Sequence, residues 1–357
     1  MHAEPLDLTS RFPVLKVGIA GYGNTGQIRR RYIDEHPNLE TIAVCDITLE
    51  PAVAPDGVRQ WKTYHELLEE DLDILFVCIT NDMAPEVTMA GLQRGLHVFC
   101  EKPPGRTVAD VAAVRNVEAN LPQLKLKYGF NHRYHDSVQD AQRIVVSGKL
   151  GDVIDMKGVY GKAKMIRFDA DWRTRRDVAG GGILLDQGIH MLDMMRFFGG
   201  EFADIHAFVT NEYWKHDVED NAYAIMRTDK GVVAMVHSSA TQWRHRFNLD
   251  ITLSEGALVL SGILSSTKSY GAETLTVVYR GEHDGGDPRE VTTRYNSDDS
   301  WRREVLEFAD CVMRDEPVRY GSSLDALKTM QLVYDVYAAD RDWAEAWDIQ
   351  PTEAVVR

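Results

Sequence analysis

The chain has 357 residues, of which 44% are hydrophobic and 27% charged, and its formal net charge at pH 7 is −15. This length predicts two domains with an ample core. The acidic balance argues against a broad nucleic-acid surface, because such a surface must neutralise phosphates with Lys and Arg.

The opening residues 1–13 are polar and lack a contiguous apolar run, so we expect neither a signal peptide nor a membrane anchor there. The rest of the chain shows no predicted membrane segment. The four cysteines have no CxxC spacing, which favours buried thiols in a reducing cytoplasm over a disulfide framework.

The first predicted unit is a strand, a glycine turn and a helix. An apolar run over 14–20 leads into Gly21-Tyr22-Gly23-Asn24-Thr25-Gly26, and a helix-compatible stretch follows over 27–32. Gly21 would allow a tight turn, Gly23 the approach of a pyrophosphate, and Gly26 close packing of helix on strand. The first helical turn would offer free N–H groups to phosphate. Because glycine turns are common, the surrounding pattern has to support this interpretation.

A second apolar run over 41–45 ends at Asp46, about 20 residues beyond Gly26. An acidic side chain at that place can bind both ribose hydroxyls of the adenosine half of a dinucleotide, and it repels a 2′-phosphate. Ile47 and Thr48 provide no arginine for such a phosphate. The sequence therefore favours NAD over NADP, and the alternative is that Asp46 is an ordinary turn residue at a strand end.

The alternation of strand and helix continues to about residue 100. Residues 73–80 and 97–100 are typical of buried parallel strands, and residues 85–94 are typical of a helix. The later strand ends at Glu101-Lys102-Pro103-Pro104. Ligands bind at the carboxyl ends of strands in an open doubly wound sheet, which places Lys102 at the cofactor crevice. The alternative is a surface lysine before a proline turn.

After about residue 150 the pattern changes to strands and turns. Strands are predicted over 153–162, 202–211, 222–227, 232–239, 247–253, 257–262 and 275–280, a turn over 281–288, and helices over 300–314 and 322–337.

A broad sheet with helices on one face leaves its other face to be covered. We therefore expect a homodimer or homotetramer that forms through this sheet.

One strongly apolar helix, between residues 180 and 200, carries Asp186, His190 and Asp193 at i, i+4 and i+7 on one narrow face. Burying a carboxylate and an imidazole without partners is costly, so a polar group must meet this stripe. Gly188 within the helix marks the close approach of another group. The stripe is either a site of chemistry or a polar seam between two domains, with Asp186 capping the helix behind the triple glycine.

Three motifs in this order resemble the Gfo/Idh/MocA oxidoreductase family, named for glucose-fructose oxidoreductase and inositol dehydrogenase. They are the glycine turn, Glu-Lys-Pro at 101–103, and GGG…DxGxHxxD over 180–193. The resemblance is supported by three further motifs, which are GFNHRY at 129–134, DWR at 171–173 and EDN at 219–221. The resemblance covers nearly the whole chain. Departures are the absence of a Thr-Pro-Asn and of a histidine over 80–84, and Pro104 where an aliphatic residue is more usual.

The resemblance implies an α/β fold with two parts and an active site in the cleft between them. An N-terminal Rossmann domain with a doubly wound parallel sheet binds NAD and is expected over 1–131. A C-terminal α/β domain with a large open, mostly antiparallel sheet is expected over 132–357 for substrate binding and oligomerisation. A C-terminal helix at about 322–340 is a candidate to pack back on the Rossmann domain.

Lys102, Asp186 and His190 fall on the positions of the family's catalytic residues. His190 is the expected general acid/base, because histidine titrates near working pH. Lys102 would hold the same substrate oxygen and stabilise its developing charge, and which of the two moves the proton stays open. Asp186 would orient substrate hydroxyls or the other two groups. Cofactor contacts are expected from Gly21, Tyr22, Gly23, Asn24, Thr25, Gly26, Asp46, Thr80, Asn81, Glu101 and Lys102. Substrate contacts are expected from Arg133, Tyr134, Trp172, Arg173, Asp186 and His190. Of these six, Arg133, Tyr134, Trp172 and Arg173 are equally compatible with packing or surface roles.

The leading hypothesis is an NAD-dependent dehydrogenase or reductase that acts on a hydroxyl or keto carbon of a sugar, cyclitol or nucleotide-linked sugar. Two alternatives stay open: a glycosidase-like or epimerising enzyme that recycles a tightly bound NAD, and a non-catalytic NAD-binding regulator. No metal is expected, because no third ligand accompanies His132 with His135 or Asp186 with His190. Basic residues 29–31 are expected on the outer face of the cofactor helix, and residues 173–176 either form a solvated loop or meet an anionic substrate.

Overall fold

The computed structural model describes residues 12–163, 172–265, 269–281 and 286–349. The chain divides into two compact units, each described here by itself. Unit 1 comprises Met1–Pro104, Asp110–Gly129 and Trp301–Leu324, and unit 2 comprises Gly105–Ala109, Phe130–Ser300 and Asp325–Arg357. The expected boundary between 131 and 132 and the packing of the C-terminal helix stay predictions. Most of the polar lead-in over 1–13, and Asp171, lie outside the described residues.

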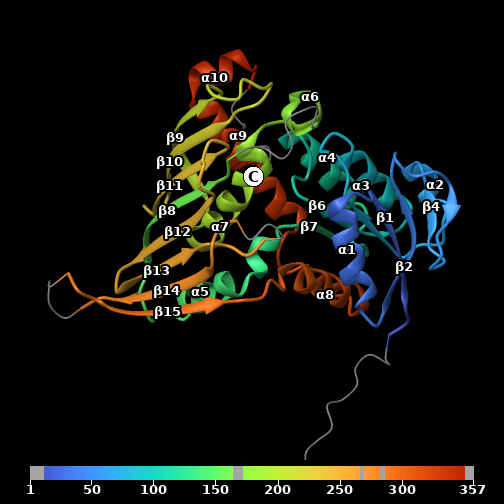
Figure 1. Cartoon of the computed structure of the whole chain (residues 1–357), viewed down its shortest axis with the longest axis horizontal. Coiled ribbons are helices and arrows are strands. Elements are labelled where there is room, and N and C mark those ends of the chain that lie inside the picture. The colour runs from blue at the N-terminus through green and yellow to red at the C-terminus, as the bar shows by residue number, and fades with distance from the viewer. Residues whose placement is uncertain (1–11, 164–171, 266–268, 282–285, 350–357) are drawn as a thin grey trace, which may run out of the picture. The chain divides into compact units, whose positions relative to one another are not determined.

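Unit 1 contains a seven-stranded sheet in the order β3-β4-β2-β1-β5-β6-β7 (Figure 1). Its neighbouring strands run parallel except for β3 and β4. The strand order reverses between β1 and β5, which is where doubly wound sheets bind a dinucleotide. The strands are β1 (Leu15–Ala20), β2 (Leu39–Cys45), β3 (Ala52–Val53), β4 (Arg59–Trp61), β5 (Ile74–Val77), β6 (His97–Glu101) and β7 (Leu126–Gly129).

The helices of unit 1 include one from the last quarter of the chain. α8 (Ser300–Met313) places Val305 and Phe308 in the same core as the strand residues Phe76 and Phe99. Aromatic pairs among Phe76, Phe99 and Phe308 have ring centroids 4.8 to 6.0 Å apart. α8 therefore belongs to the sheet's own core. The other helices are α1 (Asn24–Asp34), α2 (Tyr64–Leu67), α3 (Ala84–Gln93) and most of α4 (Val108–Glu118).

Unit 2 contains an eight-stranded sheet in the order β15-β14-β13-β12-β8-β11-β10-β9. Only β8 and β11 pair in parallel among its described strands, so the sheet is mostly antiparallel, which confirms the predicted fold class. The strands are β8 (Val153–Gly161), β9 (Phe202–Thr210), β10 (Asn221–Thr228), β11 (Val233–Ser239), β12 (Arg246–Leu253), β13 (Gly256–Ser261), β14 (Glu273–Tyr279) and β15 (Arg289–Tyr295).

β15, like β3, β4 and β7, was not predicted from the sequence. Six of its seven residues are exposed, so no buried face produces an apolar alternation. Its place is fixed by pairing with β14, in which Thr276 faces Thr292 and their hydroxyls lie 2.8 Å apart. The turn predicted over 281–288 lies partly outside the described residues.

The helical segments of unit 2 include a central helix that packs closely on the sheet. α7 (Ile189–Gly199) brings Met191 and Met195 so near to β8 that a Cβ atom at Gly158 would lie 2.6 Å from Met195 Cε. The others are η2 (Asn131–Tyr134), α5 (Asp136–Val146), η3 (Trp172–Thr174), α6 (Arg176–Ala179), η4 (Leu184–Gly188), α9 (Ser323–Ala339) and α10 (Arg341–Ala346). Within the described part of the chain, no helix combines the length and apolar character needed to cross a membrane.

Candidate functional site

The glycine turn lies between β1 and α1 as predicted, and its three glycines meet different surroundings. Gly21 has φ of +89°, and a side chain there would overlap the carbonyl oxygen of Cys78. A side chain at Gly26 would overlap the carbonyl oxygen of Gly21. At Gly23, by contrast, a Cβ atom would have no neighbour within 4 Å. Two glycines therefore serve the turn itself, and the third leaves a space beside it.

The space at Gly23 adjoins a helix N-terminus that suits a phosphate. Gly23 is the N-cap residue of the 11-residue helix α1, no side chain caps this end, and its first turn contains no acidic residue. The N–H groups of the first turn therefore remain available to an anion. These features fit the pyrophosphate of a dinucleotide.

Asp46 follows β2 and holds the glycine turn. Its Oδ2 accepts a hydrogen bond from the backbone N–H of Tyr22 at 2.9 Å, and its Oδ1 accepts from the Thr48 hydroxyl at 2.7 Å and the Thr48 N–H at 3.0 Å. The side chain is half-buried, so part of the carboxylate remains accessible. Asp46 therefore has a structural role at this strand end, and its contact with ribose hydroxyls stays a prediction.

The other predicted cofactor residues follow β5 and β6. Thr80 begins the turn into α3, with its carbonyl accepting from Met83 and Ala84, and Asn81 beside it is buried. Glu101 ends β6, and Lys102 follows directly. Both segments leave the sheet at the carboxyl ends of their strands, the edge where such sheets bind ligands.

The expectation for the basic residues 29–31 is wrong in one respect. Arg31 is exposed, but Arg29 is fully buried, with its Nε 2.5 Å from Glu101 Oε1 and its Nη2 2.6 Å from Glu304 Oε2. The helical period places these neighbours on different faces of α1, and only partners distant in sequence make a buried arginine tolerable.

Unit 2 gathers His190 with a second histidine and a tyrosine. The rings of His190 and His132 stack with centroids 3.8 Å apart, and His132 Nε2 lies 3.1 Å from the Tyr160 hydroxyl. Asn131 Oδ1 is 3.2 Å from His132 Nδ1. Burial raises the pKa of Tyr160, so its hydroxyl remains protonated. This arrangement fixes the His132 ring against which His190 stacks.

Asp186 lies between two cationic side chains. Lys162 Nζ donates to Asp186 Oδ2 at 3.2 Å, and Arg173 Nε is 3.6 Å from Asp186 Oδ1. Arg173 also stacks on the Trp172 ring at 4.3 Å. Lys162 was not among the predicted site residues, because it follows β8 and its pairing across the sequence has no local signal.

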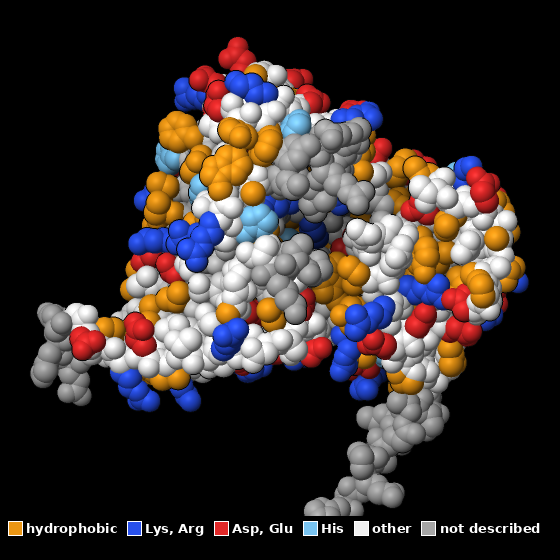
Figure 2. Space-filling model, viewed as in Figure 1, with side chains coloured by type: hydrophobic (Ala, Val, Ile, Leu, Met, Phe, Trp, Pro, Cys, Tyr) orange, Lys and Arg blue, Asp and Glu red, His pale blue; other side chains and the backbone are white. Residues whose placement is uncertain are grey.

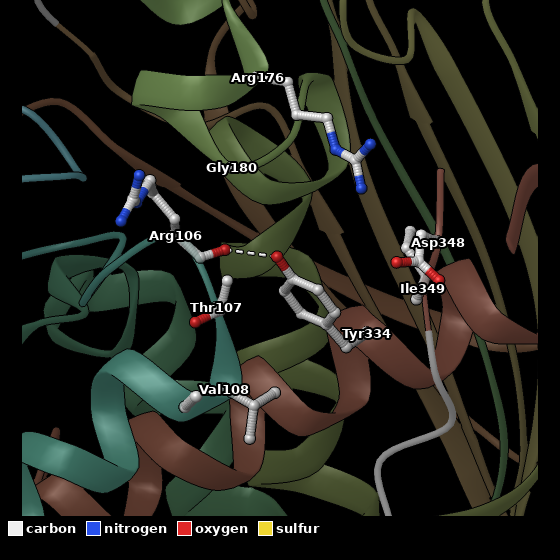
Figure 3. A pocket seen from close by; sticks show the side chains of 9 residues that line it. Arg106, Thr107, Val108, Arg176, Gly180, Tyr334, Asp348 and Ile349 are labelled. Atoms are coloured by element: carbon white, nitrogen blue, oxygen red, sulfur yellow. Dashed lines mark hydrogen bonds between the residues drawn. The ribbon is translucent and has the colours of Figure 1, made fainter. Parts of the chain in front are cut away.

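The basic residues 173–176 do not act as one cluster. Arg173 turns towards Asp186, while Arg175 pairs with Asp177 at 2.5 Å. Arg176 extends over a separate cavity of about 430 Å³, towards the side where Asp348 lies (Figure 3). None of the three predicted catalytic residues lines that cavity, whose lining residues are Arg106, Thr107, Val108, Ala109, Arg176, Gly180, Tyr334, Asp348 and Ile349.

The segment carrying Asp186 and His190 is not one regular α-helix. Residues 184–188 are π-helical, and α7 begins at Ile189, so the i, i+4, i+7 spacing does not describe a single face. Asp193 instead forms a two-point ion pair with Arg133, with nitrogen–oxygen distances of 2.7 and 2.6 Å. Arg133 Nη1 also donates to Asp325 at 3.0 Å. This geometry gives Asp193 and Arg133 structural roles, while substrate binding by Arg133 and by the buried Tyr134 stays a prediction.

A buried glutamate, rather than Asp186, holds the start of this segment. Glu219 accepts hydrogen bonds from the N–H of Gly182 at 2.6 Å and of Leu184 at 2.9 Å, and from the Tyr337 hydroxyl at 2.7 Å. Gly188 has the close neighbour that the sequence predicts, which is Ser238. A Cβ atom at residue 188 would lie 2.6 Å from Ser238 Oγ. The π-helical turn is thus fixed at both ends.

No group of three His, Cys, Asp or Glu side chains placed to hold a metal ion occurs among the residues that the structure describes. The four cysteines are free, and burial raises the pKa of both Cys45 and Cys100 to about 12. These thiols therefore remain protonated near neutral pH.

Comparison with known proteins relates both units to sugar and cyclitol dehydrogenases. D-xylose 1-dehydrogenase (NADP(+)) 2 of Haloferax volcanii is 27% identical over 89% of this chain and 95% of its own length. Myo-inositol 2-dehydrogenase of Thermotoga maritima is 28% identical over 63% of this chain and 68% of its own. The solved structure of levoglucosan dehydrogenase with NADH and L-sorbose superposes with a TM-score of 0.82 at 17% identity, covering 93% of this chain and 98% of that one, which shows a shared fold.

Two family models match in succession. Residues 15–126 match the oxidoreductase family, NAD-binding Rossmann fold, and residues 138–259 match the GFO/IDH/MocA C-terminal domain. The first range holds the glycine turn and Lys102, and the second holds Asp186 and His190. With both parts present in order, the chain belongs to the Gfo/Idh/MocA family of NAD-binding oxidoreductases.

Proposed function

We propose that the protein is an NAD-dependent dehydrogenase or reductase that transfers a hydride between the nicotinamide and a hydroxyl or keto carbon of a sugar, cyclitol or nucleotide-linked sugar. The observation that carries the proposal is the group in unit 2 where His190 stacks on His132 and Asp186 pairs with Lys162. Such a group offers both a proton carrier and fixed hydrogen-bonding partners for hydroxyls. The named activities of the xylose and inositol dehydrogenase relatives support it.

The residues of unit 1 would hold the cofactor, which supplies or accepts the hydride when bound. The N–H groups at the start of α1 and the space at Gly23 would receive the pyrophosphate. The accessible part of the Asp46 carboxylate would bind the ribose hydroxyls of the adenosine half. Thr80, Asn81 and Glu101, at the carboxyl ends of β5 and β6, would line the nicotinamide half.

His190 and Lys102 would act on the reacting oxygen of the substrate. Oxidation of an alcohol requires a base that takes the hydroxyl proton as the hydride leaves, and an imidazole does so near neutral pH. The ammonium group of Lys102 would donate to the same oxygen and stabilise its negative charge. Asp186, oriented by Lys162, would accept hydrogen bonds from a neighbouring substrate hydroxyl.

The preference for NAD over NADP rests on Asp46. A carboxylate facing the adenosine ribose repels a 2′-phosphate, and Ile47 and Thr48 after it provide no cation. The relatives include both an NADP-dependent xylose dehydrogenase and a levoglucosan dehydrogenase crystallised with NADH. No observation favours the glycosidase-like or regulatory alternatives. The free cysteines, of which Cys45, Cys100 and Cys311 are buried, support the proposed location in the reducing cytoplasm.

The protein is also proposed to form a homodimer or homotetramer through the sheet of unit 2. Along β9 to β11, exposed and buried positions alternate, as in a sheet with one face in solvent. Several of the exposed positions nevertheless carry apolar side chains: Phe208 is 74%, Ile225 50% and Met235 45% exposed. Figure 2 shows hydrophobic side chains over the region where Figure 1 places these strands. A hollow of about 630 Å³ adjoins them, lined in part by His206 and Tyr223. A second copy of this sheet would cover such a surface symmetrically.

Replacing Gly23 by Ala and Gly26 by Ala should separate cofactor binding from folding. Gly23→Ala should leave the free energy of unfolding within about 1 kcal/mol and weaken NAD binding at least about tenfold, because the methyl group occupies the expected pyrophosphate space. Gly26→Ala should lower the free energy of unfolding by about 1–3 kcal/mol through overlap with Gly21. Urea denaturation measures the free energy of unfolding, and calorimetric titration measures the affinity for NAD. Unchanged NAD affinity in Gly23→Ala would contradict the assigned role.

Asp46→Asn should reduce the preference for NAD over NADP about tenfold, because the amide keeps an oxygen for the Tyr22 N–H but loses the charge that repels a 2′-phosphate. Titration of each nucleotide into both proteins gives the ratio of dissociation constants. Thr48→Val, which removes one partner of the same carboxylate without changing charge, serves as the control. A parent protein that binds NADP more tightly than NAD would refute the interpretation of Asp46.

Lys102→Met and His190→Ala should each lower hydride transfer by about 100-fold or more while NAD affinity stays within a few-fold, since both act on the substrate oxygen. The assay is absorbance of reduced nicotinamide with NAD across aldoses, inositols, sugar acids and UDP- or dTDP-sugars. The exposed Lys62→Met provides a matched control. Full turnover in His190→Ala would exclude that residue from the mechanism. A substrate-dependent rise in absorbance that persists in Lys102→Met would exclude the lysine from it.

Phe208→Glu should shift the protein towards monomers, because it places a charge in the apolar sheet face. Light scattering coupled to size-exclusion chromatography reports the mass. Val146→Glu, on α5 and 75% exposed outside the sheet, controls for a change of surface charge. A wild-type protein that elutes as a monomer at micromolar concentration would rule out this interface.

A further inference from the structure

A buried charge cluster joins three elements of unit 1 at the end of β6. The guanidinium of Arg29 on α1 lies between the carboxylates of Glu101 on β6 and Glu304 on α8, at 2.5 and 2.6 Å. Its Cζ atom lies over the Phe99 and Trp301 rings, at 4.4 and 4.3 Å from the ring centroids. Two carboxylates and two aromatic rings therefore orient the guanidinium.

Glu101 is held from a second side. It pairs with Gly129 across β6 and β7, and a Cβ atom at residue 129 would lie 2.8 Å from Glu101 Oε2 and 3.2 Å from Arg29 Nη2. The carboxylate thus packs directly against the neighbouring strand. Because Lys102 follows Glu101 in the chain, the cluster also fixes the point from which Lys102 leaves the sheet.

Glu304 is fully buried, and the proposed hydride transfer does not use it. Its Oε2 bonds Arg29, while its Oε1 has no hydrogen-bond partner among the described residues. Burial and the neighbouring Glu101 charge raise the pKa of Glu304 to about 7, against the lowering effect of the Arg29 and Lys127 charges. Lys127 on β7 is itself paired with Glu307 of α8. A pKa in this range allows Glu304 to gain or lose its proton near neutral pH.

We propose that Arg29 and Glu304 form, with Glu101, a positioning cluster for the nicotinamide end of the cofactor site, and that the charge of Glu304 sets the relative affinity for oxidised and reduced cofactor. This inference rests on the proposed NAD-dependent function. The cluster lies at the carboxyl end of β6, on the side of the strand-order reversal that would receive the nicotinamide.

The physical reason is a charge difference between the two forms of the cofactor. The oxidised nicotinamide ring carries a positive charge and the reduced ring is neutral, whereas the rest of the molecule is the same. An ionised Glu304 gives the Arg29–Glu101–Glu304 group a net negative charge, and a protonated Glu304 leaves it neutral. The oxidised form should therefore gain affinity relative to the reduced form as the pH rises through about 7.

The test measures binding rather than turnover, so no substrate has to be known. Dissociation constants of NAD and NADH are determined by calorimetry at pH 6 and pH 8 for the full chain and for Glu304→Gln. In the wild type, the affinity for NAD relative to NADH should rise about threefold to tenfold between the two pH values. In Glu304→Gln, which cannot ionise at this position, the ratio should be the same at both pH values.

Two further variants distinguish charge from general structural damage. Asp310→Asn removes a carboxylate from the same helix at an exposed position and should keep the wild-type pH dependence. Arg29→Lys retains the charge but cannot bond both carboxylates and stack on both rings, so NADH affinity should fall about tenfold or more. Circular dichroism and thermal melting identify any variant that fails to fold.

The outcomes are separable. A wild-type protein that binds neither nucleotide refutes the proposed function itself. Binding with a pH-independent ratio, or a Glu304→Gln variant with the full wild-type change, overturns the assignment to Glu304. A folded Arg29→Lys variant with unchanged NADH affinity overturns the positioning role of Arg29.

Discussion

The cost of burying charge without a partner governs both units of this protein. A buried ionised group loses its hydration, and only a close counter-charge with good hydrogen-bond geometry offsets that loss. Arg29 meets this condition through Glu101 and Glu304, and Asp193 meets it through Arg133. Each pair ties together segments distant in the chain, because α8 supplies Glu304 and η2 supplies Arg133. The elements that carry the predicted site residues are thus oriented by ion pairs as well as by apolar packing.

The same constraint explains the structural roles of several buried polar residues in unit 2. Asp193 and Arg133 bind each other at two points, which commits both to the joint between α7 and η2. Glu219 is committed to the N–H groups that begin the π-helical turn. Asp186 lies between Lys162 and Arg173, and His190 stacks on His132. These contacts orient the two residues of unit 2 that the proposed hydride transfer uses.

Local patterns in the sequence predict β1, β2, β5, β6, the described strands of unit 2 other than β15, and the glycine turn, because each depends on periodicity or backbone conformation within a few residues. The family resemblance, rather than these patterns, implies the fold class. Features that depend on distant partners escape such patterns. Arg29 and Arg31 belong to the same basic run in the sequence. The burial of Arg29 is tolerable only because the carboxylate of Glu304 on α8 pairs with it. Lys162 has no local signal for its pairing with Asp186. The π-helical turn replaces the regular spacing that suggested one polar face, and exposed β15 has no apolar alternation to reveal it.

The stacked histidines limit how the proposed proton transfer can proceed. Two imidazolium rings with centroids 3.8 Å apart would repel strongly in a buried setting, so the pair is best suited to hold one extra proton at a time. A proton taken by His190 from a substrate hydroxyl would therefore require His132 to stay neutral, with its Nε2 facing the Tyr160 hydroxyl. Because burial raises the pKa of Tyr160, that hydroxyl keeps its proton and can orient the ring without accepting the charge. In the proposed mechanism, the pair would therefore carry one proton at a time, and His132 would be neutral while His190 is charged.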